Sequence, residues 1–380
     1  MSWEKVKLGD VADSCLGKML DQVKNRGEYE PYLANLNVRW GYFELDNLSQ
    51  MRFESDEQER YGLKYGDLVI CEGGEPGRCA IWKDQIPNMK IQKALHRVRV
   101  HDCLDYRYLY YWFLYAGQTK ALEQYFTGAT IKHMPGEKLK SICIDFPPKE
   151  VQQRISEILW PIDSLIENNQ KQIKLLEEAA QRLYKEWFVD LRFPGYKTTP
   201  VIGGIPDGWT EGALINLAQF KRGKTITKDQ VHSGAIPVVA GGLEPAYYHD
   251  IYNTDAPVIT VSGSGANAGF TRMYYTRVWA SDCSYVDAST TKDVAWIYCF
   301  LKGNKAGINL LQKGAAQPHV YAKDLNAMKA IIPCNDVMEQ FRIMAEPMFA
   351  EIGKLDAQIK LLAEASNRLL LKLMNGELEV

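Results

Sequence analysis

The segment QIKLLEEA at residues 172–179 decides the fold, because it recurs almost unchanged as QIKLLAEA at residues 358–365. The offset of 186 residues also pairs Gly128 with Gly314, His133 with His319, Leu139 with Leu325, Pro147 with Pro333 and Pro161 with Pro347. The two halves also begin alike, since Trp3, Leu8 and Gly17 recur as Trp209, Leu214 and Gly223. A solenoid repeat would have a period of about 20–50 residues. The much longer period predicts a duplicated domain with internal two-fold pseudosymmetry.

Two long stretches, 150–188 and 336–374, have a helical period in which mostly apolar residues alternate at spacings of four and three. This spacing is typical of a coiled-coil seam. The simplest way to bury two matched seams is against each other, which predicts an antiparallel coiled coil. The seam residues are Ile155, Leu159, Ile162, Ile166, Asn169, Ile173, Leu176 and Leu183 in the first stretch, and Phe341, Met348, Ile352, Leu355, Ile359, Leu362, Leu369 and Leu373 in the second.

An amphipathic helix lying on its own domain is the alternative for each stretch. Pro161 and Pro347 interrupt the two seams at equivalent positions. A proline inside a helix costs ~3 kcal/mol, whereas a proline at the first helical position is tolerated. Each helix is therefore expected either to kink or to restart at its proline. Asn169 is the one amide in the first seam, and Leu355 stands at its equivalent in the second.

The remaining sequence indicates two mixed α/β domains. Short apolar runs such as 67–70 and 80–82 predict strands. Aromatic runs at 106–115 and 296–301 each follow an aspartate and predict buried helices, with base stacking as the alternative. We therefore predict an α+β fold with two pseudo-symmetric mixed α/β domains, separated by two long helices that form an antiparallel coiled coil. The predicted segments are a first domain at 1–148, a central long helix at 149–190, a linker at 191–208, a second domain at 209–334 and a C-terminal long helix at 335–380.

Composition indicates an ordinary globular chain of 380 residues with a net charge of −2. No stretch approaches the ~18 uncharged apolar residues of a membrane span, and the start MSWEKVKLGD has no signal-peptide core. We therefore expect a cytoplasmic protein without membrane contact. Only residues 191–334 are basic, with 14 Lys and Arg against 10 Asp and Glu. If the chain binds DNA, its contacts must be local, or a partner must carry much of the positive charge.

Motifs for catalysis and metal binding are not found. Glycine-rich segments at 72–78 and 262–269 lack the Gly-Lys-Ser/Thr ending of a phosphate loop, which favours tight turns between strands. There is no His-Glu-x-x-His zinc motif, and the eight scattered cysteines contain no Cys-x-x-Cys pair. We expect no catalytic residue, no metal site and no cofactor in this chain.

Three longer segments resemble a known family. They are FPPKEVQQRI at 146–155, KEWFVDLRFP at 185–194 and GAAQPHVYAKDL at 314–325. Together with the starts of the two halves around Trp3 and Trp209, they resemble the specificity subunits of type I restriction–modification systems. The resemblance covers essentially the whole chain. One departure lies at 333–342, which keeps Gln340 but has lost the double proline.

The resemblance implies that two target-recognition domains each read one half of a split site in double-stranded DNA. It implies that the two long helices pack together and hold the domains apart. Two methyltransferase subunits would dock on this frame and bring S-adenosylmethionine and the catalytic residues. A restriction–translocase subunit can join such a complex.

Candidate DNA contacts are the polar and basic residues that flank the repeated elements. Arginine and lysine suit phosphates or guanine, and glutamine suits adenine. For each residue, a solvated surface charge is the alternative. The candidates are Lys18, Arg78, Lys132, His133, Arg222, Lys224, Gln317, His319 and Lys323.

Two other classes of function compete with DNA recognition. A coiled-coil scaffold could assemble partner proteins without reading DNA, although the basic excess of 191–334 argues against it. An enzyme that acts alone is the other alternative, and it lacks a recognisable catalytic motif. The sequence does not specify the recognised bases or the spacer between the half-sites.

Overall fold

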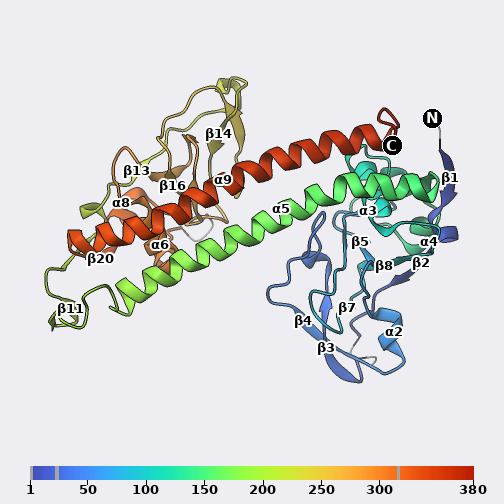
Figure 1. The fold of residues 1–380 in the computed structure, drawn as a ribbon, viewed down its shortest axis with the longest axis horizontal. Coiled ribbons are helices and arrows are strands. Elements are labelled where there is room, and N and C mark those ends of the chain that lie inside the picture. Colours follow the sequence, from blue (N-terminus) through green and yellow to red (C-terminus); the bar gives the residue numbers. More distant parts are fainter. Residues whose placement is uncertain (1–2, 22–24, 315–316) are drawn as a thin grey trace. The chain divides into compact units, whose positions relative to one another are not determined.

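The computed structural model describes residues 3–21, 25–314 and 317–380 (Figure 1). The chain forms two compact units, Met1–Ile166 with Leu361–Val380, and Glu167–Lys360. Each unit contains one mixed α/β domain and part of both long helices. No helix in the described part of the chain is long and apolar enough to cross a membrane.

The first unit contains three sheets built from short strands. A four-stranded antiparallel sheet has the order β2-β8-β5-β6, a three-stranded sheet the order β4-β3-β7, and β1 pairs with β9. In sequence order these strands are β1 Glu4–Lys7, β2 Ala12–Leu16, β3 Glu28–Leu33, β4 Ser49–Phe53, β5 Leu68–Cys71, β6 Cys79–Ile81, β7 Lys90–Ile91, β8 Leu95–Val100 and β9 Cys143–Phe146. The helices are α1 Leu8–Val11, α2 Glu57–Tyr61, α3 Tyr106–Gln118 and α4 Gly136–Lys140.

The second unit repeats this topology sheet by sheet. Its four-stranded sheet has the order β13-β19-β16-β17, its three-stranded sheet the order β15-β14-β18, and β12 pairs with β20. These strands are β12 Thr210–Ala213, β13 Lys221–Arg222, β14 Ile236–Val239, β15 Tyr247–His249, β16 Val258–Ser262, β17 Thr271–Tyr274, β18 Trp279–Ala280, β19 Cys283–Asp287 and β20 Lys329–Ile332. The helices are α6 Val294–Gly303, α7 Lys305–Leu310 and α8 Ala322–Asn326. Even the one parallel pair recurs, as β3 with β7 and as β14 with β18. The predicted duplication is thereby confirmed at the level of strand pairing.

The aromatic runs form buried helices, as predicted. The Asp105 carboxylate caps α3 by accepting hydrogen bonds from the backbone amides of Arg107 and Tyr108. Tyr108 and Phe113 of α3 are fully buried in the first domain core. In α6 the residues from Val294 to Leu301 are all buried. These rings therefore fill the cores and are not a surface for base stacking.

The long helices α5, Lys149–Tyr184, and α9, Asn335–Met374, run continuously through Pro161 and Pro347 (Figure 1). Neither helix restarts at its proline, so that alternative from the sequence is wrong. Beyond α5, a π-helical turn at Lys185–Val189 and a short hairpin of β10 Val201–Ile202 with β11 Ile205–Pro206 lead into the second domain.

The two long helices pair antiparallel. In the second unit, Asn169 of α5 donates to Gln358 of α9 at 3.2 Å, while the Tyr184 ring lies 6.3 Å from that of Phe341. Partner numbers thus fall along α9 as they rise along α5. The predicted antiparallel coiled coil between two mixed domains is confirmed. Asn169, the one polar residue among the predicted seam residues, is 2% exposed. Its side-chain hydrogen bond to Gln358 links α5 to α9.

The seam residues are buried to different degrees along the helices. None of the predicted seam residues is exposed. At the ends of the seams, however, residues pack into the domain cores. Ile155 and Leu159 join the first domain core with Leu373, and Phe341 joins the second. The helices therefore bury their apolar faces both on each other and on the domains.

A buried carboxyl group links the helices within the first unit. Asp163 of α5 accepts hydrogen bonds from the Tyr111 hydroxyl at 2.9 Å and from the Ser366 hydroxyl of α9 at 3.2 Å. Burial raises the pKa of Asp163 above its usual value, although both hydrogen bonds oppose the shift. Asp163 thus joins α3, α5 and α9 at one point.

Candidate nucleic-acid interface

The repeated histidine closes an equivalent loop in each domain. In the first domain, His133 exchanges two backbone hydrogen bonds with Thr127, at 2.8 and 2.9 Å. In the second, His319 makes the same pair of bonds with Lys313, also at 2.8 and 2.9 Å. Gly128 has a φ of +91°, which suits glycine, at the start of the first loop. The sequence repeat therefore marks a structural hairpin whose neck is held by backbone bonds.

Each histidine loop lies against the glycine-rich turn of its own domain. The Met134 amide donates to the Glu72 carbonyl at 2.7 Å, and the Val320 amide donates to the Gly263 carbonyl at 3.1 Å. A Cβ atom at Gly73 would lie 2.8 Å from the His133 ring, so a larger residue there would displace that ring. Two motifs that the sequence presented separately thus form one site per domain. The glycine turns connect β5 to β6 and β16 to β17, as predicted.

Two candidate cations of the first domain, Lys18 and Arg78, are held by neighbouring groups. Lys18 is 3% exposed and forms an ion pair with Glu57. The Arg78 guanidinium donates to Glu75 at 3.0 Å and to the backbone and side-chain oxygens of Asn35 at 3.1 Å. Lys18 is therefore placed in the domain interior, away from any DNA surface, and Arg78 braces the glycine turn.

The exposed candidates of the first domain lie in its histidine loop. Lys132 and His133 are both exposed, and the Lys132 ammonium lies 5.9 Å from the Phe126 ring centroid. Behind the loop, the buried His96 ring makes a 2.9 Å hydrogen bond to the Met134 carbonyl. Burial lowers the pKa of His96, with the Met134 bond as an opposing effect.

Four of the five candidates in the second domain come together. Arg222 and His319 line one small cavity of about 40 Å³. The His319 ring stacks on Tyr321 with centroids 5.9 Å apart and planes at 12°, and the Lys323 ammonium lies 5.9 Å from the same Tyr321 ring. Gln317, two residues before His319, is exposed. This group, which we call the Arg222 cluster, is Arg222, Gln317, His319, Tyr321 and Lys323.

Lys224 lies beside the Trp279 ring rather than in the Arg222 cluster. Its ammonium is 5.9 Å from the ring centroid, and the Trp279 indole donates to the Lys224 carbonyl at 2.8 Å. Among the described residues, no carboxylate lies within ion-pair distance of Arg222, Lys224 or Lys323. These three cations are thus available to an anionic ligand, whereas Arg272, Arg277 and Lys313 of the same domain are paired with carboxylates.

Sequence reasoning missed several residues of these sites. Asp282 and Ser284 line the same small cavity as Arg222, and Asp282 accepts a short hydrogen bond from Ser264. Asn35 and Glu75 hold Arg78 in the first domain. None of the four belongs to the sequence repeat, so only the folded sheets bring them to the site.

A metal site is not formed by the described residues, among which no group of three or more His, Cys, Asp or Glu side chains could hold an ion. Four of the eight cysteines, Cys71, Cys79, Cys283 and Cys299, are buried free thiols. Burial raises the pKa of the Cys71 thiol to about 11, which leaves it protonated at neutral pH.

Comparison with known proteins finds similarity to type I restriction systems. Residues 1–178 match the family model of the type I restriction modification DNA specificity domain. The chain is 27% identical over 344 residues to the MjaIX specificity subunit of Methanocaldococcus jannaschii, covering 83% of this chain and 78% of that protein. It is 23% identical over 236 residues to the HindI specificity subunit of Haemophilus influenzae, covering 59% and 48%. The family model thus covers 178 of the 380 residues, and both relatives are specificity subunits of type I restriction enzymes.

The fold agrees with this similarity. The crystal structure of the type I restriction–modification S subunit from M. genitalium superposes with a TM-score of 0.62 at 16% identity, covering 98% of this chain and 96% of that one. The chain therefore shares the fold of that S subunit. A scaffold that does not read DNA is not favoured.

Proposed function

We propose that each domain reads one half of a bipartite DNA site through its histidine loop and the neighbouring glycine turn. The observation that carries this proposal is the repetition of one backbone site with different side chains. The loop necks at Thr127–His133 and Lys313–His319 are built alike, while the surrounding polar residues differ. A common frame with divergent side chains suits two domains that bind the same polymer at different sequences.

The exposed residues divide into those that contact bases and those that contact phosphates. In the second domain, Arg222 has the planar donor geometry for the guanine O6 and N7 acceptors, and Gln317 can pair with adenine. Lys224 and Lys323 supply phosphate contacts that position the domain. In the first domain, the exposed Lys132 and His133 of the histidine loop make the contacts to DNA.

Catalysis is supplied by partners in this proposal. Two methyltransferase subunits dock on the frame of α5 and α9 and bring S-adenosylmethionine and the catalytic residues, while this chain supplies no catalytic group. A restriction–translocase subunit joins the same complex, which acts on DNA in the cytoplasm. The net charge of −2 supports this division, because tight binding to a polyanion then requires cations from the partners.

Binding and methyl transfer by separate and reconstituted components test the proposal. The purified chain alone is expected to bind DNA weakly at physiological salt and to transfer no methyl group. Addition of the methyltransferase subunit is expected to give tight, sequence-specific binding and methylation. Strong specific binding by this chain alone, or methyl transfer without the partner, would contradict the proposed division of roles.

A further inference from the structure

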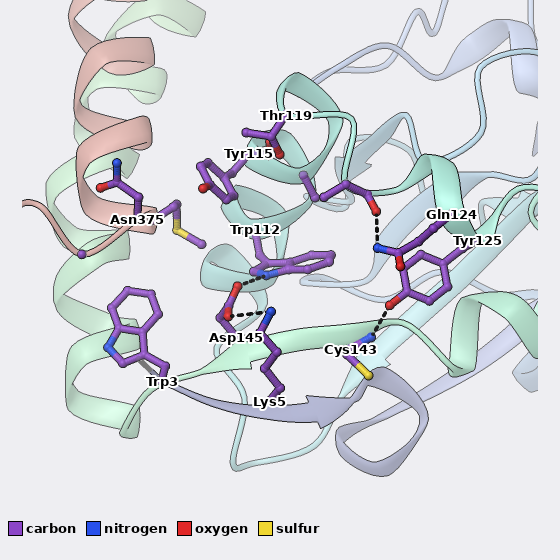
Figure 2. Close-up of a pocket in the computed structure, with 14 residues that line it drawn as sticks. Trp3, Lys5, Trp112, Tyr115, Thr119, Gln124, Tyr125, Cys143, Asp145 and Asn375 are labelled. Carbon is purple, nitrogen blue, oxygen red and sulfur yellow. Dashed lines mark hydrogen bonds and ion pairs between the residues drawn. The ribbon is translucent and has the colours of Figure 1, made fainter. Parts of the chain in front are cut away.

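The first unit contains a cavity of about 670 Å³, and four of its 14 lining residues are aromatic (Figure 2). Trp112 and Tyr115 come from α3, Tyr125 from the segment after it, and Trp3 from the chain start, just before β1. The end of α9 closes one wall with Met374, Asn375 and Gly376. The cavity lies outside the histidine loop and its glycine turn, so DNA reading does not explain it.

The equivalent place in the second domain is filled by the chain itself. Trp209, the counterpart of Trp3, is 6% exposed, because Phe193 lies 4.8 Å from it and Phe188 lies 5.9 Å from it, measured between ring centroids. Phe193 is 3% exposed. Both phenylalanines belong to the segment at the end of α5 and just beyond it.

The described residues of the first unit do not repeat this filling. At the offset of 186 residues, Met374 replaces Phe188 and Glu379 replaces Phe193. Glu379 is exposed, and Trp3 remains only half-buried beside the open cavity. The second domain therefore shows what kind of group fits beside Trp3 in the first. It is an aromatic side chain from a segment that packs against the tryptophan.

The polar lining of the cavity differs from that of the filled site. Asp145 accepts a 3.1 Å hydrogen bond from the Trp112 indole, and its other oxygen lies 3.7 Å from the Lys5 ammonium (Figure 2). The corresponding pair in the second domain is Ile331 and Glu211. A carboxylate accepts several hydrogen bonds, so Asp145 can take a further donor. An aromatic ring that carries a donor, tyrosine or tryptophan, matches this cavity better than phenylalanine does.

We propose that this cavity is the docking site for one tyrosine or tryptophan side chain of the methyltransferase subunit, whose O–H or N–H donates to Asp145. This inference rests on the proposed function, since it names a contact within that complex. The ring would stand where Phe193 stands in the second domain and would stack beside Trp3. A buried aromatic anchor in a preformed pocket is the usual form of an interface hot spot.

Ala121 offers a position from which to test the cavity. It is exposed and lines the cavity, and its carbonyl accepts a hydrogen bond from Gln124 that side-chain replacement leaves in place. Ala121→Trp would occupy the space intended for the partner ring. Lys138→Trp is the matched control, because Lys138 is exposed on α4 and does not line the cavity.

The affinity of each full-length variant for the methyltransferase subunit is measured by titration calorimetry. Ala121→Trp is expected to weaken assembly by at least about tenfold, as loss of an anchor residue does, with Lys138→Trp close to the unsubstituted chain. In a second experiment, a photo-reactive benzoylphenylalanine replaces Glu123 in the reconstituted complex, because Glu123 is exposed beside the cavity and does not line it. Mass spectrometry is expected to find it joined to a methyltransferase peptide that contains tyrosine or tryptophan.

The outcomes separate this inference from the proposed function. If the unsubstituted chain assembles, but Ala121→Trp assembles equally well and no methyltransferase peptide is joined, the docking site is wrong while the proposed function stands. A peptide from a second copy of this chain would overturn the inference in favour of self-association. If the unsubstituted chain does not bind a methyltransferase subunit at all, the proposed function fails and the inference fails with it.

Discussion

The two domains share one strand order but use their cations differently. In the first domain, Arg78 is held by Asn35 and Glu75. In the second, Arg222 is exposed and has no carboxylate within ion-pair distance among the described residues. The duplicated sheets can therefore keep their strand pairing while the arginine near one loop is held by neighbouring side chains in one domain and is free to bind a ligand in the other. Fold is set by the buried faces, and the exposed faces are free to diverge.

The two domains also differ where the two long helices end. Phe188, in the π-helical turn that follows α5, lies within an aromatic cluster, whereas its counterpart Met374 at the end of α9 borders an open cavity. The second domain thus completes its own core, and the first leaves space at the same place. The following predictions test this difference, beginning with the largest expected effect.

Alanine substitutions at the two helix ends should differ in cost. The Phe188 ring lies 5.0 Å from that of Phe341 and 5.9 Å from that of Trp296, so Phe188→Ala should cost ~3–5 kcal/mol of unfolding free energy. Met374→Ala should cost about 2 kcal/mol, because water already reaches the neighbouring space. Urea unfolding followed by hydrogen exchange in each domain measures both. Equal costs would show that the two ends are supported alike.

Alanine substitutions at the two arginines should separate stability from recognition. Arg222→Ala should weaken DNA binding by the assembled complex by ~1–3 kcal/mol at one base position only. Arg78→Ala should instead destabilise the first domain by ~1–3 kcal/mol, because the polar groups of Asn35 lose their partner.

Competition binding on single-base variants of the site and thermal unfolding together measure these effects. Arg222→Lys is the control, since it keeps the charge but removes the planar donor pair. The contrast between the domains fails if Arg78→Ala leaves stability unchanged and relaxes one base position.

Glutamine substitutions of lysines should distinguish phosphate contacts from internal ion pairs. Lys224→Gln or Lys323→Gln should each reduce the slope of log K against log salt by about one. Lys18→Gln should leave the slope unchanged and lower stability, because it removes the partner of Glu57. Filter binding across a salt series gives the slopes. A reduced slope for Lys18→Gln would place that ammonium on the DNA after all.

Acidification should loosen the first domain through His96, with the smallest effect of the set. Burial lowers the pKa of His96 from its usual ~6.5, so the unfolded chain takes up a proton at a pH where the folded chain does not. Stability from this group is therefore present above pH ~6.5 and is lost as the pH falls through the lowered pKa. Ser284, which stands at the equivalent strand position, does not titrate.

Hydrogen exchange at Met134 and its neighbours, measured between about pH 7 and 5, tests this effect. Faster opening on acidification is expected in the unsubstituted chain and less so in His96→Gln, which keeps a donor for the Met134 carbonyl. An identical pH response in the two chains would exclude His96 as the cause.

The long helices and the start of α3 could be predicted from the sequence, because periodicity and capping residues reflect local and buried structure. The seam spacing located α5 and α9, and the aspartate before the aromatic run located the start of α3. The sequence left open whether each helix restarts at Pro161 or Pro347 or continues through it, and both helices continue, because helix packing offsets the local penalty.

The sites followed only in part. His133 and His319 were found because they recur, whereas the partners of Lys18 and Arg78 depend on how distant segments meet. Glu57 is 39 residues from Lys18, and Asn35 is 43 residues from Arg78. No periodicity links such pairs, so an exposed cation and a paired one look the same in the sequence. The open cavity beside Trp3 was hidden for the same reason.

Methylome sequencing of a host that carries the methyltransferase and an Arg222→Ala, Gln317→Ala double variant tests most directly whether each domain reads one half-site. The account predicts that bases in one half of the methylated site become degenerate, while the other half and the spacer stay unchanged. The reciprocal variant, Lys132→Ala with His133→Ala, should relax only the other half. Changes in both halves from either variant would contradict the reading of one half-site by each domain.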